Sequence, residues 1–231
     1  MRVALVTVGD EILSGDTVNT NAAWLGERLT ASGADVERLT VIPDRVAEIA
    51  RVVNEYRAEY DAVIVTGGLG PTHDDVTMEG VAAAFGTEVA PDQEAERWLA
   101  EEAGYSGDDL APETTAIPDE ATFLRNPDGV APGCTIGNVY VLPGLPAEMK
   151  AMFELIADEF GGDVRHVATV ETPEPESELL DRIEELRERF GVIVGSYPGE
   201  HVRLKIEGYD EETVAEAADW LKANVEAPDD A

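Results

Sequence analysis

Residues 61–85 read DAVIVTGGLGPTHDDVTMEGVAAAF, and this stretch decides how the chain folds. Val63, Ile64 and Val65 form an apolar run typical of a buried strand, and apolar residues then recur at helical spacing from Val76 to Phe85. A strand, a glycine-rich loop and a helix in this order form the repeating unit of a parallel α/β sheet. The stretch therefore predicts an α/β fold.

The glycine loop between strand and helix is suited to binding an anion. Gly67, Gly68 and Gly70 allow a sharp turn and leave no Cβ between the backbone N–H groups and a ligand. The first turn of the following helix adds unpaired N–H donors. The loop matches neither the P-loop nor the Gly-x-Gly-x-x-Gly dinucleotide pattern, so it predicts phosphate binding outside those two standard motifs.

Two carboxylates follow the glycines. Asp74 and Asp75 would repel a diphosphate unless a cation lay between them, and a hard divalent ion such as Mg²⁺ binds carboxylates and phosphate oxygens together. The structural alternative is that Thr72 and Asp75 form a capping box at the helix N-terminus. Both interpretations remain open at the level of the sequence.

The composition bounds the class of protein. With 231 residues, of which 44% are hydrophobic, the chain can form one α/β domain and a small appendage. It has no run of eighteen apolar residues and no signal sequence, so we expect a soluble, cytoplasmic protein without membrane partners. Cys134 is the only cysteine, which excludes an internal disulfide, and we expect it to be packed in the core.

The chain is strongly acidic. Its net charge of −33 arises from 49 acidic and 16 basic residues. Nucleic acid is therefore not an expected partner, because that affinity depends on neutralising phosphates with Lys and Arg. A halophilic, high-potassium cytoplasm that screens the charges is the simplest explanation, and an acidic protein with a basic partner is the alternative.

Three predicted strands end in loops that could share one ligand. Apolar runs end at Val8, Val65 and Leu142, each before a turn and a helical segment. In a parallel sheet these loops meet at the carboxyl edge, where open α/β sheets bind ligands. The expected strands of this part are 2–8, 36–42, 61–65, 121–124 and 135–142, and the expected helices are 21–32, 45–59, 76–85 and 95–103.

The pattern changes after the linker around residues 172–175. Strand, helix, two strands and helix are expected at 166–171, 176–190, 192–197, 201–207 and 211–225, which is a βαββα module. We therefore divide the chain into domains at 1–165 and 166–231.

Four motifs in order resemble those of the CinA family, the competence/damage-inducible proteins. The motifs are Gly9–Gly15 with Asn19-Thr20-Asn21, Thr66–Thr72 with Asp74-Asp75, Asn126-Pro127 with Ala131-Pro132-Gly133, and Leu142–Pro146 with Glu148-Met149. The resemblance covers nearly the whole chain. It implies a three-layer, mostly parallel sheet of the molybdopterin-binding (MoCF) type, a homo-oligomer, and no amidase domain after residue 231.

The resemblance also implies a chemistry and the residues for it. Proteins similar to this one are associated with metal-dependent cleavage of ADP-ribose or of flavin adenine dinucleotide. The implied ligand is a nucleotide or molybdopterin, with Mg²⁺, Mn²⁺ or Co²⁺, and K⁺ as a further candidate ion. The implied roles are phosphate or ligand binding by Gly67, Gly68, Gly70, Thr72, Thr77, Asn21, Gly144, Pro146 and Glu148, metal binding by Asp10, Glu11, Asp74 and Asp75, and catalysis by Asp74 and Asp75.

Alternatives remain for several of these residues and for the activity. Asp10 and Glu11 could cap the turn after the first strand, and Asn19 or Asn21 could cap the next helix. The main hypothesis is a metal-dependent nucleotide pyrophosphatase. The others are a molybdopterin-binding or molybdopterin-adenylating protein of cofactor synthesis and a non-catalytic ligand sensor.

Overall fold

The structure, a computed structural model, describes residues 1–101 and 112–228. The chain forms two compact units, Met1–Gly162 and Asp163–Ala231. The division falls three residues before the domain boundary expected from the sequence.

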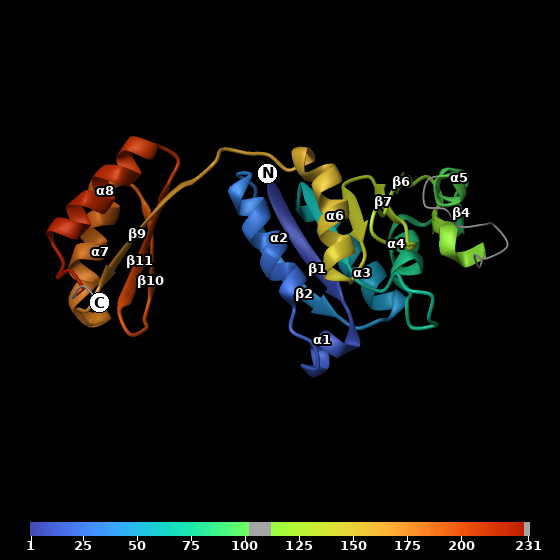
Figure 1. Ribbon diagram of the computed structural model, residues 1–231, viewed down its shortest axis with the longest axis horizontal. Coiled ribbons are helices and arrows are strands. Elements are labelled where there is room, and N and C mark those ends of the chain that lie inside the picture. Colours follow the sequence, from blue (N-terminus) through green and yellow to red (C-terminus); the bar gives the residue numbers. More distant parts are fainter. Residues whose placement is uncertain (102–111, 229–231) are drawn as a thin grey trace. The chain divides into compact units, whose positions relative to one another are not determined.

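The first unit is built on a six-stranded sheet with the order β2-β1-β3-β8-β7-β6 (Figure 1). The pairings β1–β2, β1–β3 and β3–β8 are parallel, whereas β7 and β6 extend the sheet in antiparallel fashion. The predicted mostly parallel α/β sheet is therefore confirmed. The strands are Arg2–Val8 (β1), Asp35–Ile42 (β2), Ala62–Thr66 (β3), Thr122–Leu124 (β6), Gly133–Ile136 (β7) and Val139–Leu142 (β8).

Helices cover both faces of this sheet and make three layers (Figure 1). Alternate residues of the central strands enter two separate hydrophobic clusters, because successive side chains of a strand point to opposite faces. One cluster includes residues of α2 (Thr20–Ala31) and α6 (Pro146–Ile156), and the other includes residues of α3 (Val46–Glu59) and α4 (Thr77–Phe85). With both faces covered, the central strands are buried along almost their whole length.

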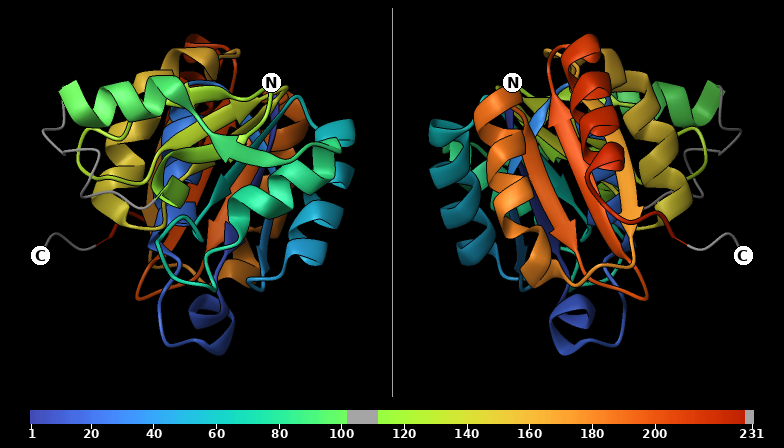
Figure 2. Two further views of the ribbon diagram at one scale, coloured as in Figure 1. Left: turned by 90° about the vertical axis from the view of Figure 1, so that its right-hand side faces the viewer. Right: turned by 90° about the vertical axis from the view of Figure 1, so that its left-hand side faces the viewer.

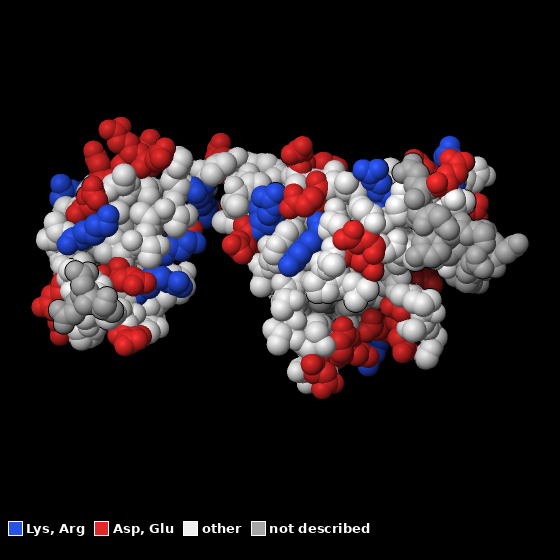
Figure 3. All heavy atoms as spheres, viewed as in Figure 1, with Lys and Arg blue, Asp and Glu red and all other residues white. Residues whose placement is uncertain are grey.

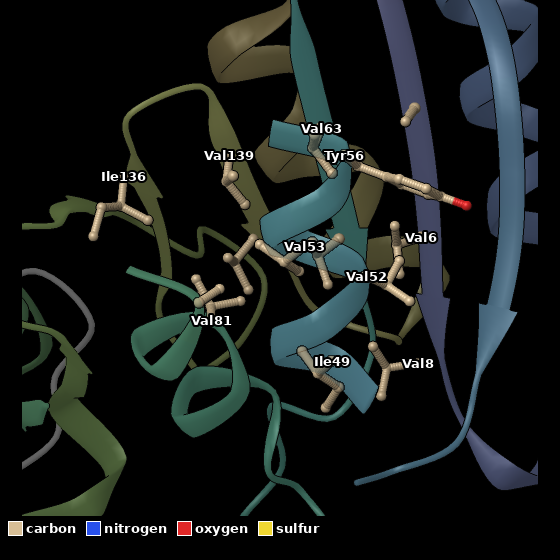
Figure 4. Close-up of a cluster of buried hydrophobic side chains, with 14 of the residues drawn as sticks. Val6, Val8, Ile49, Val52, Val53, Tyr56, Val63, Val81, Ile136 and Val139 are labelled. Atoms are coloured by element: carbon tan, nitrogen blue, oxygen red, sulfur yellow. The ribbon is translucent and has the colours of Figure 1, made fainter. Parts of the chain in front are cut away.

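The core beneath α3 and α4 places the glycine loop, since α4 follows that loop directly. Figure 4 shows Ile49, Val52 and Val53 of α3 beside valines of the sheet, all in one buried cluster. Gly80 of α4 is so close to α3 that a Cβ there would lie 2.5 Å from Cβ and Cγ2 of Ile49. The two helices therefore pack at a distance that only glycine allows.

Gly80→Ala should destabilise the first unit by about 1–3 kcal/mol, because the added methyl overpacks the interface with Ile49. The matched control is Gly26→Ala in α2, where a Cβ meets nothing within 4 Å. That control should stabilise the protein by about 0.5–1 kcal/mol through helix propensity. Urea unfolding of both variants in molar KCl measures the two changes, and equal stabilisation would contradict the packing account.

The single strand predicted at 135–142 is wrong. The structure has a hairpin there, in which β7 and β8 are joined by Gly137 and Asn138. Gly137 takes a φ of 57°, as the first central residue of a tight hairpin turn often does. The Asn138 side chain donates to the backbone oxygens of Arg57 and Tyr60 at 3.1 and 2.9 Å, which anchors the turn below α3. The reversal lets β8 run parallel to β3.

Several smaller elements complete the first unit. The five-residue helix α1 was not predicted, and the last two residues of the helix expected at 95–103 lie outside the described residues. These elements are α1 (Asp10–Ser14), β4 (Val89–Pro91), α5 (Gln93–Glu101), a 3-10 turn at Pro112–Thr115, β5 (Ala116–Pro118) and a 3-10 turn at Ala157–Glu159.

The second unit is an antiparallel sheet with the order β10-β11-β9 and two helices. Both helices lie on the same face of the sheet, as Figures 1 and 2 show from different sides. The elements are β9 (His166–Thr172), α7 (Glu176–Phe190), β10 (Ile193–Tyr197), β11 (Val202–Gly208) and α8 (Glu211–Ala223), in the βαββα order expected from the sequence.

The helices of the described residues are short and amphipathic. The longest, α7, has 15 residues and buries only Leu179, Ile183 and Leu186. Across residues 1–101 and 112–228, no helix is both long enough and apolar enough to cross a membrane.

Candidate functional site

A cavity of about 950 Å³ opens at the carboxyl edge of the parallel strands in the first unit. The loops after β1, β2, β3 and β8 all reach it, because parallel strands end on the same side of their sheet. Its volume is in the range of sites for small molecules and cofactors. Residues 7–9, 11–12, 17–21, 44, 66–72, 74–75, 128–131, 143–146 and 148 line it.

The glycine loop forms one wall of the cavity and leaves its N–H groups available. Gly67 has a φ of 98°, and a Cβ there would lie 2.2 Å from the Val8 carbonyl oxygen of β1. Its N–H donates to the Leu142 oxygen at 3.1 Å. The next three N–H groups, of Gly68, Leu69 and Gly70, donate to no acceptor within the described part of the chain. Such a run of free donors suits an anion.

Two buried polar side chains lie at this loop without a full set of partners. The Asn21 amide donates to the Gly144 oxygen at 2.7 Å, and its Oδ1 atom, which is buried, accepts no hydrogen bond from the described residues. Thr77 is fully buried beneath Gly68, with its hydroxyl equally without a partner among those residues. Asn21 lines the cavity and Thr77 does not. Asn21 therefore places a buried acceptor without a partner in the wall of the cavity.

Asp75 is held by Thr72 within the loop. Its Oδ2 atom accepts hydrogen bonds from the Thr72 N–H at 3.0 Å and from the Thr72 hydroxyl at 2.5 Å. Because α4 begins only at Thr77, this pair closes a turn of the loop and does not cap the helix. Asp74 is exposed, and its Oδ1 atom lies 3.2 Å from Nε2 of His73, which is also exposed. The two neighbouring aspartates thus have different surroundings.

Asp44, which the sequence reasoning missed, brings a further carboxylate into the cavity. It follows β2, and its Oδ2 atom accepts the Asp10 N–H at 2.8 Å. Burial raises the pKa of the Asp44 carboxyl, and the charges of Asp10, Glu11 and Asp75 raise it further, against the hydrogen bond from Asp10, which lowers it. Its position directly after a parallel strand was the signal that could have identified it.

The cavity is lined by acids without a compensating cation. The carboxylates come from α1, from three loops and from the first turn of α6, and the described lining residues include no Lys or Arg. Figure 3 shows acidic side chains gathered around α1 at this edge of the first unit. No three His, Cys, Asp or Glu side chains of the described residues are arranged as a ready metal site. The acidic lining residues are Glu11, Asp44, Asp74, Asp75, Asp128 and Glu148.

Most residues that the sequence assigned to the site do meet in this cavity. The exceptions are Thr77, which lies below the loop, and Asp10, whose backbone N–H binds Asp44. Asn19 provides the N-cap of α2, because its Oδ1 atom accepts the Ala22 N–H at 3.1 Å. The lining residues among the expected set are Glu11, Asn21, Gly67, Gly68, Gly70, Thr72, Asp74, Asp75, Gly144, Pro146 and Glu148.

Cys134 lies away from the cavity and is packed in the core. It is fully buried, and burial raises the pKa of its thiol to about 12. Its sulfur lies 3.8 Å from that of Met78. A thiol with so high a pKa is unsuited to nucleophilic catalysis.

Comparison with known families gives two matches that follow the two units. Residues 4–161 match the family described as "Probable molybdopterin binding domain". Residues 165–228 match the family described as "FAD synthase, middle domain".

Individual relatives extend these matches. A protein of Archaeoglobus fulgidus is 38% identical over 219 residues, which cover 94% of this chain and 95% of the relative. A CinA-like protein of Akkermansia muciniphila is 40% identical over 181 residues, which cover 72% of this chain and 44% of that protein. The crystal structure of the protein CinA with unknown function from Thermoplasma acidophilum has 36% identity and a TM-score of 0.63, and the match covers 70% of this chain and 100% of that one.

Proposed function

Because the chain belongs to the family of probable molybdopterin-binding domains and has a CinA-like fold, we propose that its acidic cavity binds a nucleotide or pterin phosphate with a divalent cation and cleaves a diphosphate bond. The observation that carries the proposal is the meeting of two opposite features in one cavity. Free N–H donors of the glycine loop attract an anion, and six carboxylates repel it. A phosphate bridged to the carboxylates by a cation satisfies both.

The carboxylates around Asp44 would hold the cation. Glu11, Asp44 and Asp75 offer hard oxygen ligands, the type that Mg²⁺ and Mn²⁺ prefer, and Asp10 and Asp74 are adjacent in sequence. Since these side chains form no ready metal site by themselves, phosphate oxygens of the ligand would complete the set. When bound, the cation would supply Lewis acidity and a more acidic water.

The protein's own contribution is to hold the diphosphate in place. The N–H groups of Gly68 and Gly70 would bind phosphate oxygens, and the contact of Gly67 with Val8 keeps the loop against β1. Thr72 fixes Asp75 through two hydrogen bonds, so that this carboxylate is oriented before the ligand arrives. Fixing both groups lowers the barrier chiefly through positioning.

The substrate we propose is ADP-ribose or a dinucleotide similar to flavin adenine dinucleotide. The resemblance of the sequence motifs to those of the CinA family implies the first, and the match of the second unit to the middle domain of FAD synthase supports the second. The description of the main family favours a different function, in which the cavity binds molybdopterin, and adenylation of that ligand is a further alternative. A ligand sensor would bind the same phosphates without turnover.

Product chromatography tests the proposal. The purified protein is incubated in molar KCl with ADP-ribose or flavin adenine dinucleotide and with Mg²⁺, Mn²⁺, Co²⁺ or EDTA. We expect AMP to appear with a divalent ion and to fall to background in EDTA, because the acidic cavity cannot hold a diphosphate without a cation.

Three other outcomes have distinct meanings. AMP formation that persists in EDTA would contradict the cation requirement. ATP consumption that depends on molybdopterin, without cleavage of either dinucleotide, would support the adenylating alternative. Cation-dependent binding without any product would support the sensor.

A further inference from the structure

The Asn126 side chain is completely buried, and both the nitrogen and the oxygen of its amide have hydrogen-bond partners. Its amide nitrogen donates to the Ala131 oxygen at 2.9 Å and to Oε2 of Glu148 at 2.7 Å. Its Oδ1 atom accepts the Asp128 N–H at 3.3 Å. These partners fix which side of the amide is nitrogen. Asn126 therefore presents a donor to Glu148 in one orientation.

The backbone of the same loop is shaped to accommodate the Glu148 carboxylate. A Cβ at Gly129 would lie 2.4 Å from Cδ and 2.5 Å from Oε2 of Glu148. Residue 129 must therefore be glycine for the carboxylate to lie where it does. Glu148 itself lies in the first turn of α6, which begins at Pro146. Two elements, the loop between β6 and β7 and the first turn of α6, thus determine the position of one half-buried carboxylate.

One oxygen of this carboxylate remains available. Glu148 lines the cavity, and no described residue donates to its Oε1 atom or forms an ion pair with it. Within residues 1–101 and 112–228, the only donor to Oε2 is the neutral amide of Asn126. An ionised carboxylate only accepts hydrogen bonds. Whatever meets Oε1 in the cavity must bring a donor or a positive charge.

Glu148 belongs to a different part of the cavity from the carboxylates around Asp44. Asp44 follows β2, whereas Glu148 lies in the helix that follows β8, and in the sheet order β2-β1-β3-β8 the strands β1 and β3 lie between these two. Asn21 lines the same cavity, its Oδ1 atom accepts no hydrogen bond from the described residues, and its amide is bonded to Gly144 in the loop that leads into α6. This end of the cavity offers acceptors, whereas the glycine loop offers donors.

From this arrangement we infer that Glu148, positioned by Asn126, determines ligand specificity by accepting a hydrogen bond from the part of the ligand that carries no phosphate. The chemistry it selects is a neutral donor, which a ribose diol or the amino-bearing edge of a purine or pterin ring can supply. The inference rests on the proposed function, because it assumes that the glycine loop binds the phosphate. Asn126 is a positioning residue and does not meet the ligand.

The deciding variant is Glu148→Gln, which keeps the shape of the side chain and replaces one acceptor by an amide donor. Titration calorimetry with Mg²⁺ compares two probes, inorganic pyrophosphate and a methylene-bridged analogue of ADP-ribose that cannot be cleaved. The affinity for the analogue should fall about 10- to 100-fold, as for loss of a hydrogen bond to a charged group. The affinity for pyrophosphate should stay the same or rise, because one negative charge has been removed.

Two further analogues identify the donor. One lacks the ribose hydroxyls, and the other carries inosine in place of adenosine and so lacks the ring amino group. The analogue for which the wild-type protein and Glu148→Gln no longer differ is the one that has lost the selected donor. Glu154→Gln is the matched control, since it removes the same charge from the same helix on the exposed side that pairs with Arg28.

Asn126→Asp tests the positioning role. The new carboxylate cannot donate to Glu148 until one of the two is protonated, so affinity for the ADP-ribose analogue should be low at neutral pH and recover as pH falls. A purely structural role would give no such recovery. Circular dichroism reports whether this buried variant folds, and Glu148→Gln decides the question if it does not.

The possible results separate this inference from the function on which it rests. Equal losses for pyrophosphate and the analogue would show that Glu148 acts on the cation or phosphate, and unchanged affinities for both would remove it from recognition, so either result overturns the inference alone. Failure of the wild-type protein to bind pyrophosphate with Mg²⁺ would overturn the proposed function and the inference together.

Discussion

In Gly67→Ala, phosphate binding should be lost, and the free energy of unfolding of the first unit should fall by about 3 kcal/mol. This value combines the strain of a left-handed backbone at alanine with the cost of overpacking. The φ of 98° at this position is one that L-residues rarely adopt, and the added Cβ would lie 2.2 Å from the Val8 carbonyl oxygen. That oxygen belongs to the backbone of a central strand and cannot move aside. The loop must therefore shift, and its free N–H groups shift with it.

Gly86→Ala separates the strain from the contact. Gly86 follows α4 with a φ of 73°, and a Cβ there meets nothing within 4 Å. This control should lower the free energy of unfolding by about 1 kcal/mol, from backbone strain alone, and leave pyrophosphate binding intact. Denaturant unfolding and titration with pyrophosphate and Mg²⁺ measure both properties. If Gly67→Ala bound pyrophosphate as well as Gly86→Ala does, the loop would not be the phosphate site.

Asp44→Asn should reduce cation-dependent cleavage by roughly 100-fold or more and at the same time raise the melting temperature. Replacing a residue that only hydrogen-bonds a metal ligand lowers metal affinity or activity by about 10- to 100-fold, so loss of a direct ligand should lower activity at least as much. The gain in stability follows because burial, and then repulsion by Asp10, Glu11 and Asp75, disfavour the charged form of Asp44 in the folded protein. Asparagine keeps an oxygen that can accept the Asp10 N–H.

The pH dependence of this gain has a definite sign. The pKa of Asp44 is raised on folding, so the native state binds this proton more tightly than the unfolded chain does. The ionised group therefore destabilises the fold above its raised pKa, and the penalty disappears as pH falls through that pKa. The difference in melting temperature between Asp44→Asn and wild type should be largest near neutral pH and should close in acid.

Asp75→Asn is the comparison for the same reaction. It should lose cleavage as Asp44→Asn does, but without a gain in stability, because the carboxylate it replaces accepts two hydrogen bonds from Thr72. Melting curves and AMP formation with Mg²⁺ are measured for both variants. Full activity in Asp44→Asn would exclude Asp44 as a cation ligand. A lower melting temperature in that variant would contradict the destabilising effect of the charged Asp44 carboxylate.

The success of the sequence reasoning for the fold has a local cause. Apolar runs ending at Val8, Val65 and Leu142 are buried from both faces, and such strands are recognisable from their own residues. The reasoning failed at Gly137 and Asn138, where a turn splits one apolar run into β7 and β8. The continuous hydrophobic pattern predicted one strand in spite of these two turn residues. The hydrogen bonds that anchor the turn join Asn138 to Arg57 and Tyr60, about 80 residues away, so no local pattern could predict them.

Those parts of the site that lie in short, contiguous motifs could be predicted from the sequence. The glycines of residues 67–70 and the acids beside them are contiguous, so their chemistry could be inferred from the sequence. The hydrogen bonds of Asp44 and Asn126 could not be predicted in this way, because their partners are distant along the chain: Asp44 accepts from Asp10, and Asn126 donates to Glu148. No local pattern encodes such pairs.

The sequence alone determined the α/β class, the position of the glycine loop between a strand and a helix, and the strongly acidic character of the chain, since each depends on composition or on residues adjacent in the chain. The tertiary structure decided which acids meet. The strand order β2-β1-β3-β8 brings four loops to one edge and places the charge of Asp75 near Asp44. It also puts β1 and β3 between β2, which precedes Asp44, and β8, which precedes the helix of Glu148. Electrostatic interaction depends on distance in space, and strand order sets that distance.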